Sequence, residues 1–253
     1  MEYVEPAQAR NLDGLRLALT AGVPGPYSLA ARAIFDHHGV AYVSVRQVGA
    51  GANEDLVAWT GHRNAPVAVY NDEAPRAGWL EILNLAERLG SGTSLIPDDI
   101  DERMLMVGLA NELVGENGFI WNMRVAMLGL GGPERVARER GRNPMYDQYG
   151  YSDEAAAVAI DRAKVVVDRL ARQLTDQRSA GRRYLVGDAF SALDIYWAYF
   201  SQGVRTLPQE LCAMPDGMRK GYEIAGGMLG ETDPGLIEHR DFVFSEHRLP
   251  LDF

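Results

Sequence analysis

The segment Arg183–Asp194, with the sequence RYLVGDAFSALD, combines a turn, a helix start and an acid that we expect to be buried. Ser191 and Asp194 are three residues apart and directly precede the apolar run 195–200. This spacing is typical of a capping box, in which the Ser191 hydroxyl oxygen accepts the N–H of residue 194 and the Asp194 carboxylate accepts the N–H of Ser191. The following helix is apolar on all sides, so we expect it to lie in a core, where unpaired N–H groups at its start would be costly.

The chain around this segment is helical in pattern. A stretch rich in Gly, Ser, Thr and Pro at 90–97 is the best linker candidate. After it, helices are predicted over 104–130, from Ser152 to about residue 174, and from Ser191 onward. Gly108, Gly115 and Gly118 weaken the first of these helices or mark a close approach. We expect a loop over 131–150 and a less regular tail from Pro208, and together these elements predict an all-α helical-bundle C-terminal domain over 98–253.

The first third of the chain has a different pattern. Strands are predicted at 15–19, 41–45 and 65–70, and helices at 27–38 and 79–89, with a helical turn near 55–59. A strand, a helix and a strand within about 30 residues indicate a βαβ unit with parallel strands. The turn at 71–75 leads to a possible fourth, very short strand. This order predicts an α/β thioredoxin-like N-terminal domain over 13–90.

Composition limits the class of partner. The chain has 253 residues, a net charge of -10 and a pI near 5.0, which argue against nucleic acid or an anionic membrane as the main partner. Residues 1–15 lack the apolar core of a signal peptide or anchor. No later stretch approaches the ~18 to 20 uncharged apolar residues of a membrane-spanning helix. We therefore expect a soluble protein.

The sequence offers little to a metal ion. Cys212 is the only cysteine, so no intramolecular disulfide and no multi-cysteine metal site can form, and a reducing cytoplasm fits best. The pair Glu112 and Glu116 has no histidine nearby. Near the C-terminus His239, Asp241 and His247 are too loosely spaced for a helical ligand set, so we expect surface positions for them. No metal is expected.

A second motif lies in the N-terminal third, at Asn64-Ala65-Pro66-Val67. Together with the Ser191 segment it makes the chain similar, over nearly its full length, to the glutathione S-transferase superfamily. In that family a cis proline starts a strand at this motif, and the residue before it, here Ala65, pairs its backbone N–H and C=O with the cysteinyl part of glutathione. The resemblance thus implies glutathione as a co-substrate. The alternative is that Pro66 is only an edge-strand or turn proline.

The resemblance also exposes a departure at the thiol-activating position. The family uses a Ser, Cys or Tyr near the end of the first strand or the start of the first helix, because the thiolate is the nucleophile. The family's Ser or Cys aligns with Gly25, which has no side chain. Tyr27, Ser28 and Thr20 remain as substitutes, with the helix N-terminus as a further source of stabilisation. Ser28 is otherwise an ordinary first-turn serine and Tyr27 a packed aromatic.

A second departure concerns the γ-glutamyl end of glutathione. The family places an acid and then Ser or Thr at the start of the helix after the hairpin, where this chain has Ala77-Gly78. The backbone N–H groups of Gly78 and Trp79 are then the expected carboxylate donors. At the other end of the tripeptide His62, Arg63 and Asn64 are candidates for the glycyl carboxylate, with Arg63 suited by its fork of donors. Each of these is otherwise a solvated loop residue.

For the second substrate the family uses an apolar pocket lined by the first long helix of the C-terminal domain. The resemblance points to Asn111, Glu112, Glu116, Trp121 and Arg124. Most of this aromatic content is otherwise core, and the two glutamates are otherwise a solvated helix face. The implied substrate is a small hydrophobic electrophile.

Two functions of different class follow. The first is a glutathione transferase, or an isomerase of the same fold, acting on that electrophile. The second is a non-catalytic binding or scaffold protein that keeps the fold and has lost thiol activation, as Gly25 and Gly78 indicate. The resemblance also implies a homodimer.

Overall fold

The computed structural model describes residues 1–253 and divides them into two compact units. We call Met1–Ser94, Gln209–Met214 and Leu249–Phe253 the thioredoxin-like unit, and Leu95–Pro208 with Pro215–Arg248 the helical unit. The first unit therefore takes in residues 1–12 and two late segments that lie outside the predicted range 13–90. Residues 1–12 belong there because Val4 forms a parallel bridge with Val45.

The thioredoxin-like unit is built on a three-stranded sheet in the order β2-β1-β3. Its strands are β1 (Leu15–Thr20), β2 (Tyr42–Gln47) and β3 (Val67–Tyr70). β1 runs parallel to β2, with Ala18 opposite Val45, and antiparallel to β3, with Ala18 opposite Val67. The parallel pair confirms the βαβ unit. The possible fourth strand is wrong, because only one bridge, Ala68 to Arg76, forms there.

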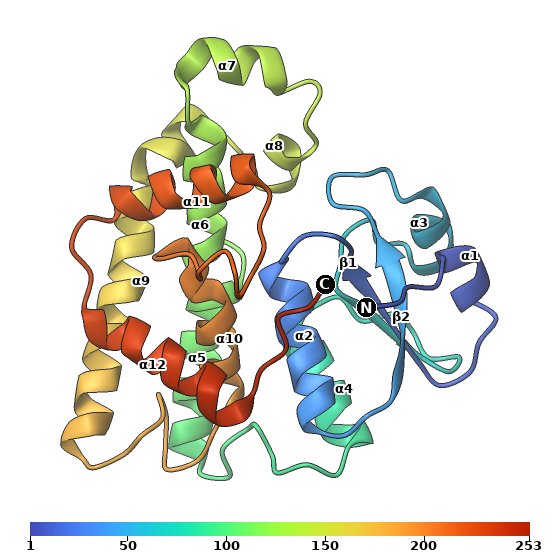
Figure 1. Ribbon diagram of the computed structural model, residues 1–253, viewed down its shortest axis with the longest axis horizontal. Helices are drawn as coiled ribbons and strands as arrows, with labels where there is room; N and C mark the ends of the chain where they lie inside the picture. Colours follow the sequence, from blue (N-terminus) through green and yellow to red (C-terminus); the bar gives the residue numbers. More distant parts are fainter. The chain divides into compact units, whose positions relative to one another are not determined.

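Helices cover both faces of this sheet (Figure 1). α2 (Pro26–His37) and α4 (Trp79–Leu89) pack together on one face, and α1 (Pro6–Ala9) and α3 (Glu54–Thr60) on the other. A cluster that includes Ala9, Val45, Leu56 and Val67 forms the core beneath α1 and α3. Because helices pack on both faces of the sheet, the end of β1, the start of α2 and the start of β3 have fixed positions.

The helical unit consists of helices alone. They are α5 (Ile100–Val114), α6 (Phe119–Gly129), α7 (Gly132–Glu139), α8 (Met145–Gln148), α9 (Asp153–Ser179), α10 (Ala192–Phe200), the 3-10 turn η1 (Ser201–Gly203), α11 (Asp216–Met228) and α12 (Pro234–His247). All nine residues of α10 are buried, and this helix packs against α5 and α12. α6 lies along α9. The predicted thioredoxin-like plus all-helical fold is confirmed.

The single helix predicted over 104–130 is instead two helices, α5 and α6, joined at 115–118. The chain doubles back against the end of α5 at this joint. A Cβ at Gly115 would lie 2.6 Å from the Asn111 carbonyl oxygen, and one at Gly118 would lie 2.4 Å from that of Glu112. Both positions therefore require glycine, which explains the break.

Two segments predicted as irregular contain helices. The expected loop 131–150 holds α7 and α8, and the expected irregular tail holds α11 and α12. α7 and α8 are too short to show clear periodicity, and the glycines of α11 obscure its pattern. α12 begins at Pro234 after Asp233, whose carboxylate accepts the Gly235 N–H at 2.8 Å. Helical signals this weak are decided by tertiary packing.

Hydrogen bonds hold the Arg183–Asp194 segment from several sides. The Asp194 carboxylate, fully buried, accepts the Ser191 N–H at 3.0 Å, the Ser191 hydroxyl at 2.8 Å and the Leu185 N–H at 3.0 Å. His239 Nε2 donates to it at 2.8 Å. The surface position expected for His239 is wrong, because its side chain is 1% exposed and satisfies the buried acid.

The long helix α9 fixes the other half of that segment. Gln173 donates its amide to the Leu185 carbonyl oxygen at 3.0 Å. Gln177 donates to the carbonyl oxygens of Tyr184 and Gly187 at 2.9 and 2.8 Å. Each of these partners is a turn backbone group that would otherwise be buried without a hydrogen bond. The carbonyl groups of Tyr184, Leu185 and Gly187 are therefore paired within the chain.

Candidate functional site

The candidate site begins at the Ala65–Pro66 peptide bond, which is cis. Pro66 is buried and leads into β3, whose pairing with β1 starts one residue later, at Val67. Ala65 is half-buried, and no hydrogen bond within the chain uses its backbone N–H or C=O. The chain therefore presents one unpaired donor and one unpaired acceptor, side by side, at the end of a strand.

Two amide side chains hold the loop that precedes this bond. The Asn53 side chain donates to the Arg63 carbonyl oxygen at 3.1 Å and to that of Val48 at 2.9 Å, and its own oxygen accepts the Val48 N–H at 2.9 Å. Gln47, 2% exposed, also donates to the Val48 carbonyl oxygen at 2.8 Å. These contacts hold the Arg63 carbonyl group, two residues before Ala65, against the segment that follows β2.

The Ser28 hydroxyl forms hydrogen bonds that connect α2 to β1. Its side chain is 5% exposed, and its hydroxyl oxygen accepts the Thr20 N–H at 3.0 Å. It donates to the Thr20 hydroxyl at 3.3 Å, which donates in turn to Gln47 Oε1 at 2.8 Å. Ser28 therefore joins α2 to the ends of both parallel strands, and its proton already has an acceptor.

Gly25 is the N-cap of α2, and its backbone suits a residue with a side chain. Its φ of -67° and ψ of 113° are ordinary for a residue before proline. A Cβ there would lie 3.4 Å from Thr20 Cβ and 3.5 Å from Thr20 Oγ1, which is ordinary contact. A Cβ is thus accommodated at Gly25, where the resemblance implies a Ser or Cys. Tyr27, in the first turn of α2, is half-buried.

The start of α4 already has a carboxylate. The Gly78 N–H, expected to receive the γ-glutamyl carboxylate, donates to Glu81 Oε2 at 3.0 Å. Glu81 is exposed and lies in the first helical turn, where a negative charge is favourable. A second carboxylate at this helix start would have to displace Glu81 or share the position with it, against charge repulsion.

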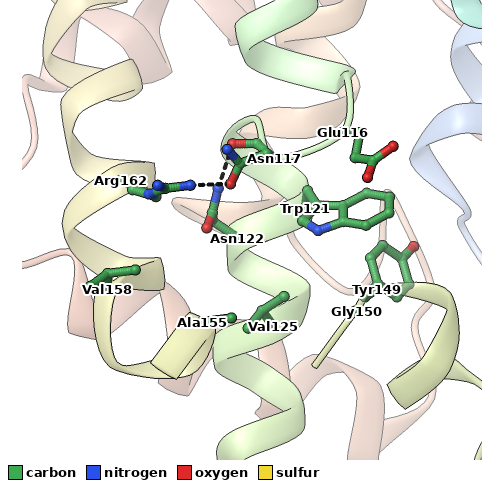
Figure 2. Close-up of a pocket in the computed structure, with 10 residues that line it drawn as sticks. All are labelled: Glu116, Asn117, Trp121, Asn122, Val125, Tyr149, Gly150, Ala155, Val158 and Arg162. Carbon is green, nitrogen blue, oxygen red and sulfur yellow. Dashed lines mark hydrogen bonds between the residues drawn. The ribbon is translucent and has the colours of Figure 1, made fainter. Parts of the chain in front are cut away.

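In the helical unit the three residues proposed for the electrophile pocket differ in their exposure to solvent. Asn111 and Glu112 are exposed on α5, whereas Trp121 is half-buried on α6. Trp121 and Glu116 line a cavity of about 340 Å³ between α6 and α9 (Figure 2). Asn111 and Glu112 do not line it. Arg124 instead donates to the Tyr222 hydroxyl and lies over the Tyr222 ring.

The structure adds three residues that the sequence analysis did not name: Gln47, Asn53 and Glu81. Glu81 had a readable signal, because it lies three residues after the helix-starting Gly78, which is capping-box spacing. Gln47 and Asn53 had none, since their partners are backbone groups brought close only by folding. No group of three or more His, Cys, Asp or Glu side chains that could hold a metal ion is present. No helix is long and apolar enough to span a membrane.

Comparison with known proteins supports the fold assignment. No family model and no curated protein matches this sequence. Among solved structures the chain is similar to a glutathione S-transferase from Methylobacterium radiotolerans in complex with glutathione sulfonate, with a TM-score of 0.62, 18% identity and coverage of 94% of this chain and 95% of that one. It is also similar to a β-etherase from Sphingobium, with a TM-score of 0.58, 18% identity and coverage of 90% and 99%.

A third similar structure is the nitrogen regulation fragment of the yeast prion protein Ure2p, with a TM-score of 0.56, 13% identity and coverage of 90% and 96%. The three structures share one architecture, and their names describe different roles. The chain therefore has the glutathione S-transferase fold. At these identities the likeness establishes the fold and leaves the reaction open.

Proposed function

We propose that this protein binds glutathione and transfers it to, or uses it to isomerise, a small hydrophobic electrophile. The observation that carries this proposal is the cis Ala65–Pro66 bond with the unpaired N–H and C=O of Ala65. A peptide placed there would gain two backbone hydrogen bonds, as in the addition of a strand to a sheet edge. That the similar Methylobacterium protein binds glutathione sulfonate supports the choice of ligand.

The remaining contacts follow from this anchor. Arg63 and Asn64 would meet the glycyl carboxylate, and the backbone N–H groups at Gly78 and Trp79 the γ-glutamyl end once Glu81 moves aside. The sulfur would face the start of α2, where Tyr27, Ser28 or Thr20 would donate to the thiolate. Ser28 can do so only if its hydroxyl proton leaves Thr20. The glutathione thiol first loses its proton to water. The thiolate sulfur then forms a bond to the electrophilic carbon while the leaving group departs from that carbon with its bonding electron pair. Asn111, Glu112 and Trp121 are the proposed contacts of that substrate.

Calorimetric titration with glutathione at millimolar concentration tests this proposal. We expect saturable binding, which the variant Ala65→Pro weakens because it removes the N–H that pairs with glutathione. The control is Ala58→Ser, which lies on α3 outside this loop and should bind glutathione as the unmodified protein does. Ala77→Pro would not serve as a control, because it alters the start of α4. No heat of binding at millimolar glutathione would contradict the proposal.

A specific observation favours the second candidate, a non-catalytic binding protein. Gly25 offers no side chain to a thiol, Ser28 is committed to Thr20, and Glu81 already caps α4. The role named for the similar Ure2p fragment, nitrogen regulation, is compatible with a fold used without catalysis. Turnover with a panel of electrophiles that Tyr27→Phe or Ser28→Ala abolishes, in protein that stays folded, would exclude this candidate.

We further propose a cytoplasmic homodimer. The cytoplasmic location rests on Cys212, the only cysteine, because a single cysteine cannot form an intramolecular disulfide. The dimer rests on the resemblance to the family. Analytical ultracentrifugation should give twice the chain mass of 27.8 kDa at micromolar concentration, and a monomer at that concentration would contradict the dimer.

A further inference from the structure

The cavity between α6 and α9 has a polar group that the fold leaves unused. Asn122 is 4% exposed, and its side-chain nitrogen donates to the Asn117 carbonyl oxygen at 2.7 Å and to that of Gly118 at 2.8 Å. These two bonds fix the orientation of the amide. Its oxygen has no hydrogen-bond partner in the chain and points into the cavity (Figure 2). An acceptor on a side chain held in one orientation at the surface of a cavity is placed to accept a hydrogen bond from a ligand.

A cation stands beside this acceptor. Arg162, from α9, donates to the Asn117 side-chain oxygen and lines the same cavity. One hydrogen bond leaves most of the five guanidinium donors of Arg162 available for a carboxylate. Glu116, drawn beside the Trp121 ring in Figure 2, is exposed and takes part in no ion pair. The cavity therefore offers a site for negative charge and, separately, acceptors for positive charge.

The rest of the lining is apolar. Val125 and Ala155 form the floor in Figure 2, and Val158 lies toward Arg162. Trp121 and Tyr149 form an aromatic wall, with ring centroids 4.9 Å apart in an edge-on arrangement. A volume of about 340 Å³ falls within the range of small-molecule pockets.

We propose that this cavity binds a zwitterionic α-amino acid with an apolar or aromatic side chain. The carboxylate pairs with Arg162, the ammonium donates to the Asn122 side-chain oxygen, and the side chain packs on Trp121 and Val125. An ammonium also suits the nearby Glu116 and the net charge of -10, which disfavour a purely anionic ligand. All lining residues belong to the helical unit, and none of them is a proposed glutathione contact.

Three probes separate the two charged contacts in calorimetric titrations without glutathione. L-phenylalanine has both groups, 3-phenylpropanoate lacks the ammonium, and 2-phenylethylamine lacks the carboxylate. We expect phenylalanine to bind, and each truncated probe to bind roughly tenfold more weakly, because each loses one charge-assisted hydrogen bond. Equal affinities for the three probes, or no binding of any, would overturn the proposal.

Variants on α9 locate the site. Arg162→Met should weaken phenylalanine and 3-phenylpropanoate roughly tenfold and leave 2-phenylethylamine unchanged, since only the carboxylate contact is lost. Arg172→Met, an exposed arginine on the same helix, is the matched control and should change nothing. Val158→Trp should block all three probes by filling the cavity, and Val165→Trp, also exposed on α9, should not.

One further result would overturn the proposal. If no probe binds and Val158→Trp alone converts a dimer to a monomer in ultracentrifugation, then a second copy of the chain covers the cavity. Retained binding in Val158→Trp together with equal effects of Arg162→Met and Arg172→Met would likewise place the ligand elsewhere.

Discussion

The Arg183–Asp194 segment and the loops around Gly25 and Ala65 differ in how completely their polar groups are used. In the first region every oxygen of a buried acid and several turn carbonyls have partners within the chain. In the second, the backbone of Ala65 is unpaired and a position with room for a side chain has none. The segment that holds the fold is satisfied internally, whereas the proposed glutathione site has backbone groups without partners in the chain.

This contrast explains why the fold can be assigned from the sequence while the activity cannot. The structural region keeps its motif, Ser191 to Asp194. The proposed glutathione site has the cis bond before Pro66 and has glycine at positions 25 and 78, where the resemblance to the family implies polar side chains. The N–H and C=O of Ala65 are backbone groups, so no substitution except one to proline removes a donor there.

The largest effect is expected from removing the hydrogen bonds that Asp194 makes in the Arg183–Asp194 segment. Asp194→Ala leaves the Leu185 N–H, the Ser191 N–H and His239 buried without a partner and should lower the free energy of unfolding by about 3–5 kcal/mol. Urea denaturation measures this change. Asp188→Ala, in the same segment, is the control: its side chain is 80% exposed, and the expected change is below about 0.5 kcal/mol. Equal losses in the two variants would contradict the assigned role of Asp194.

The second-largest effect is expected from introducing a hydroxyl group at position 25, beside the proposed glutathione site. Gly25→Ser should place a hydroxyl at the start of α2 without a clash, since its Cβ would lie 3.4 Å from the nearest atom. A thiol pKa lowered by about one unit raises the thiolate fraction at neutral pH roughly tenfold. We therefore expect at least about a tenfold rise in conjugation of a reactive aryl halide. Gly25→Ala is the control and should give no rise; a rise in both variants would show that the hydroxyl is not the cause.

A smaller effect is expected at the start of α4. Glu81→Gln keeps an acceptor for the Gly78 N–H and removes the charge that would repel a γ-glutamyl carboxylate. Because a charge near a helix end is worth about 0.3–1 kcal/mol, glutathione should bind roughly two- to fivefold more tightly, and less so at high salt. Glu87→Gln, late in the same helix, is the comparison variant. Unchanged or weaker binding in Glu81→Gln would place the γ-glutamyl group elsewhere.

The smallest effect concerns a buried histidine of the thioredoxin-like unit. His38 is 2% exposed, its Nδ1 has no partner, and burial lowers its pKa, although Glu87 at 3.2 Å partly opposes this. Below a pH of about 6.5 the unfolded chain takes up a proton that the folded chain resists, so stability should fall as the pH drops through this range. Thermal melts between pH 8 and 5 should show this slope, and His38→Gln should flatten it. An unchanged slope in the variant would assign it to other groups.

The sequence predicts those parts of the molecule whose signals are local. Ser191 and Asp194 mark a helix start, and Ala65-Pro66 marks a strand start, because the relevant spacing lies within a few residues. His239 was expected at the surface, since its partner Asp194 is 45 residues away and only folding brings them together.

The candidate site shows the same limit. The departure at Gly25 is visible in the sequence, but the commitment of Ser28 to Thr20 and Gln47 depends on the register of two strands. The break between α5 and α6 likewise depends on a close approach at Gly115 and Gly118 that spacing alone does not reveal. Contacts between residues that are distant in the sequence therefore could not be predicted from the sequence alone.

The most direct test is a crystal structure of the protein grown with glutathione. We predict that the cysteinyl N–H and C=O of glutathione pair with the C=O and N–H of Ala65 at hydrogen-bond distances of about 2.8–3.1 Å. The sulfur should then face the first turn of α2, near Thr20 and Tyr27. Glutathione bound elsewhere, with the backbone of Ala65 still unpaired, would contradict the account.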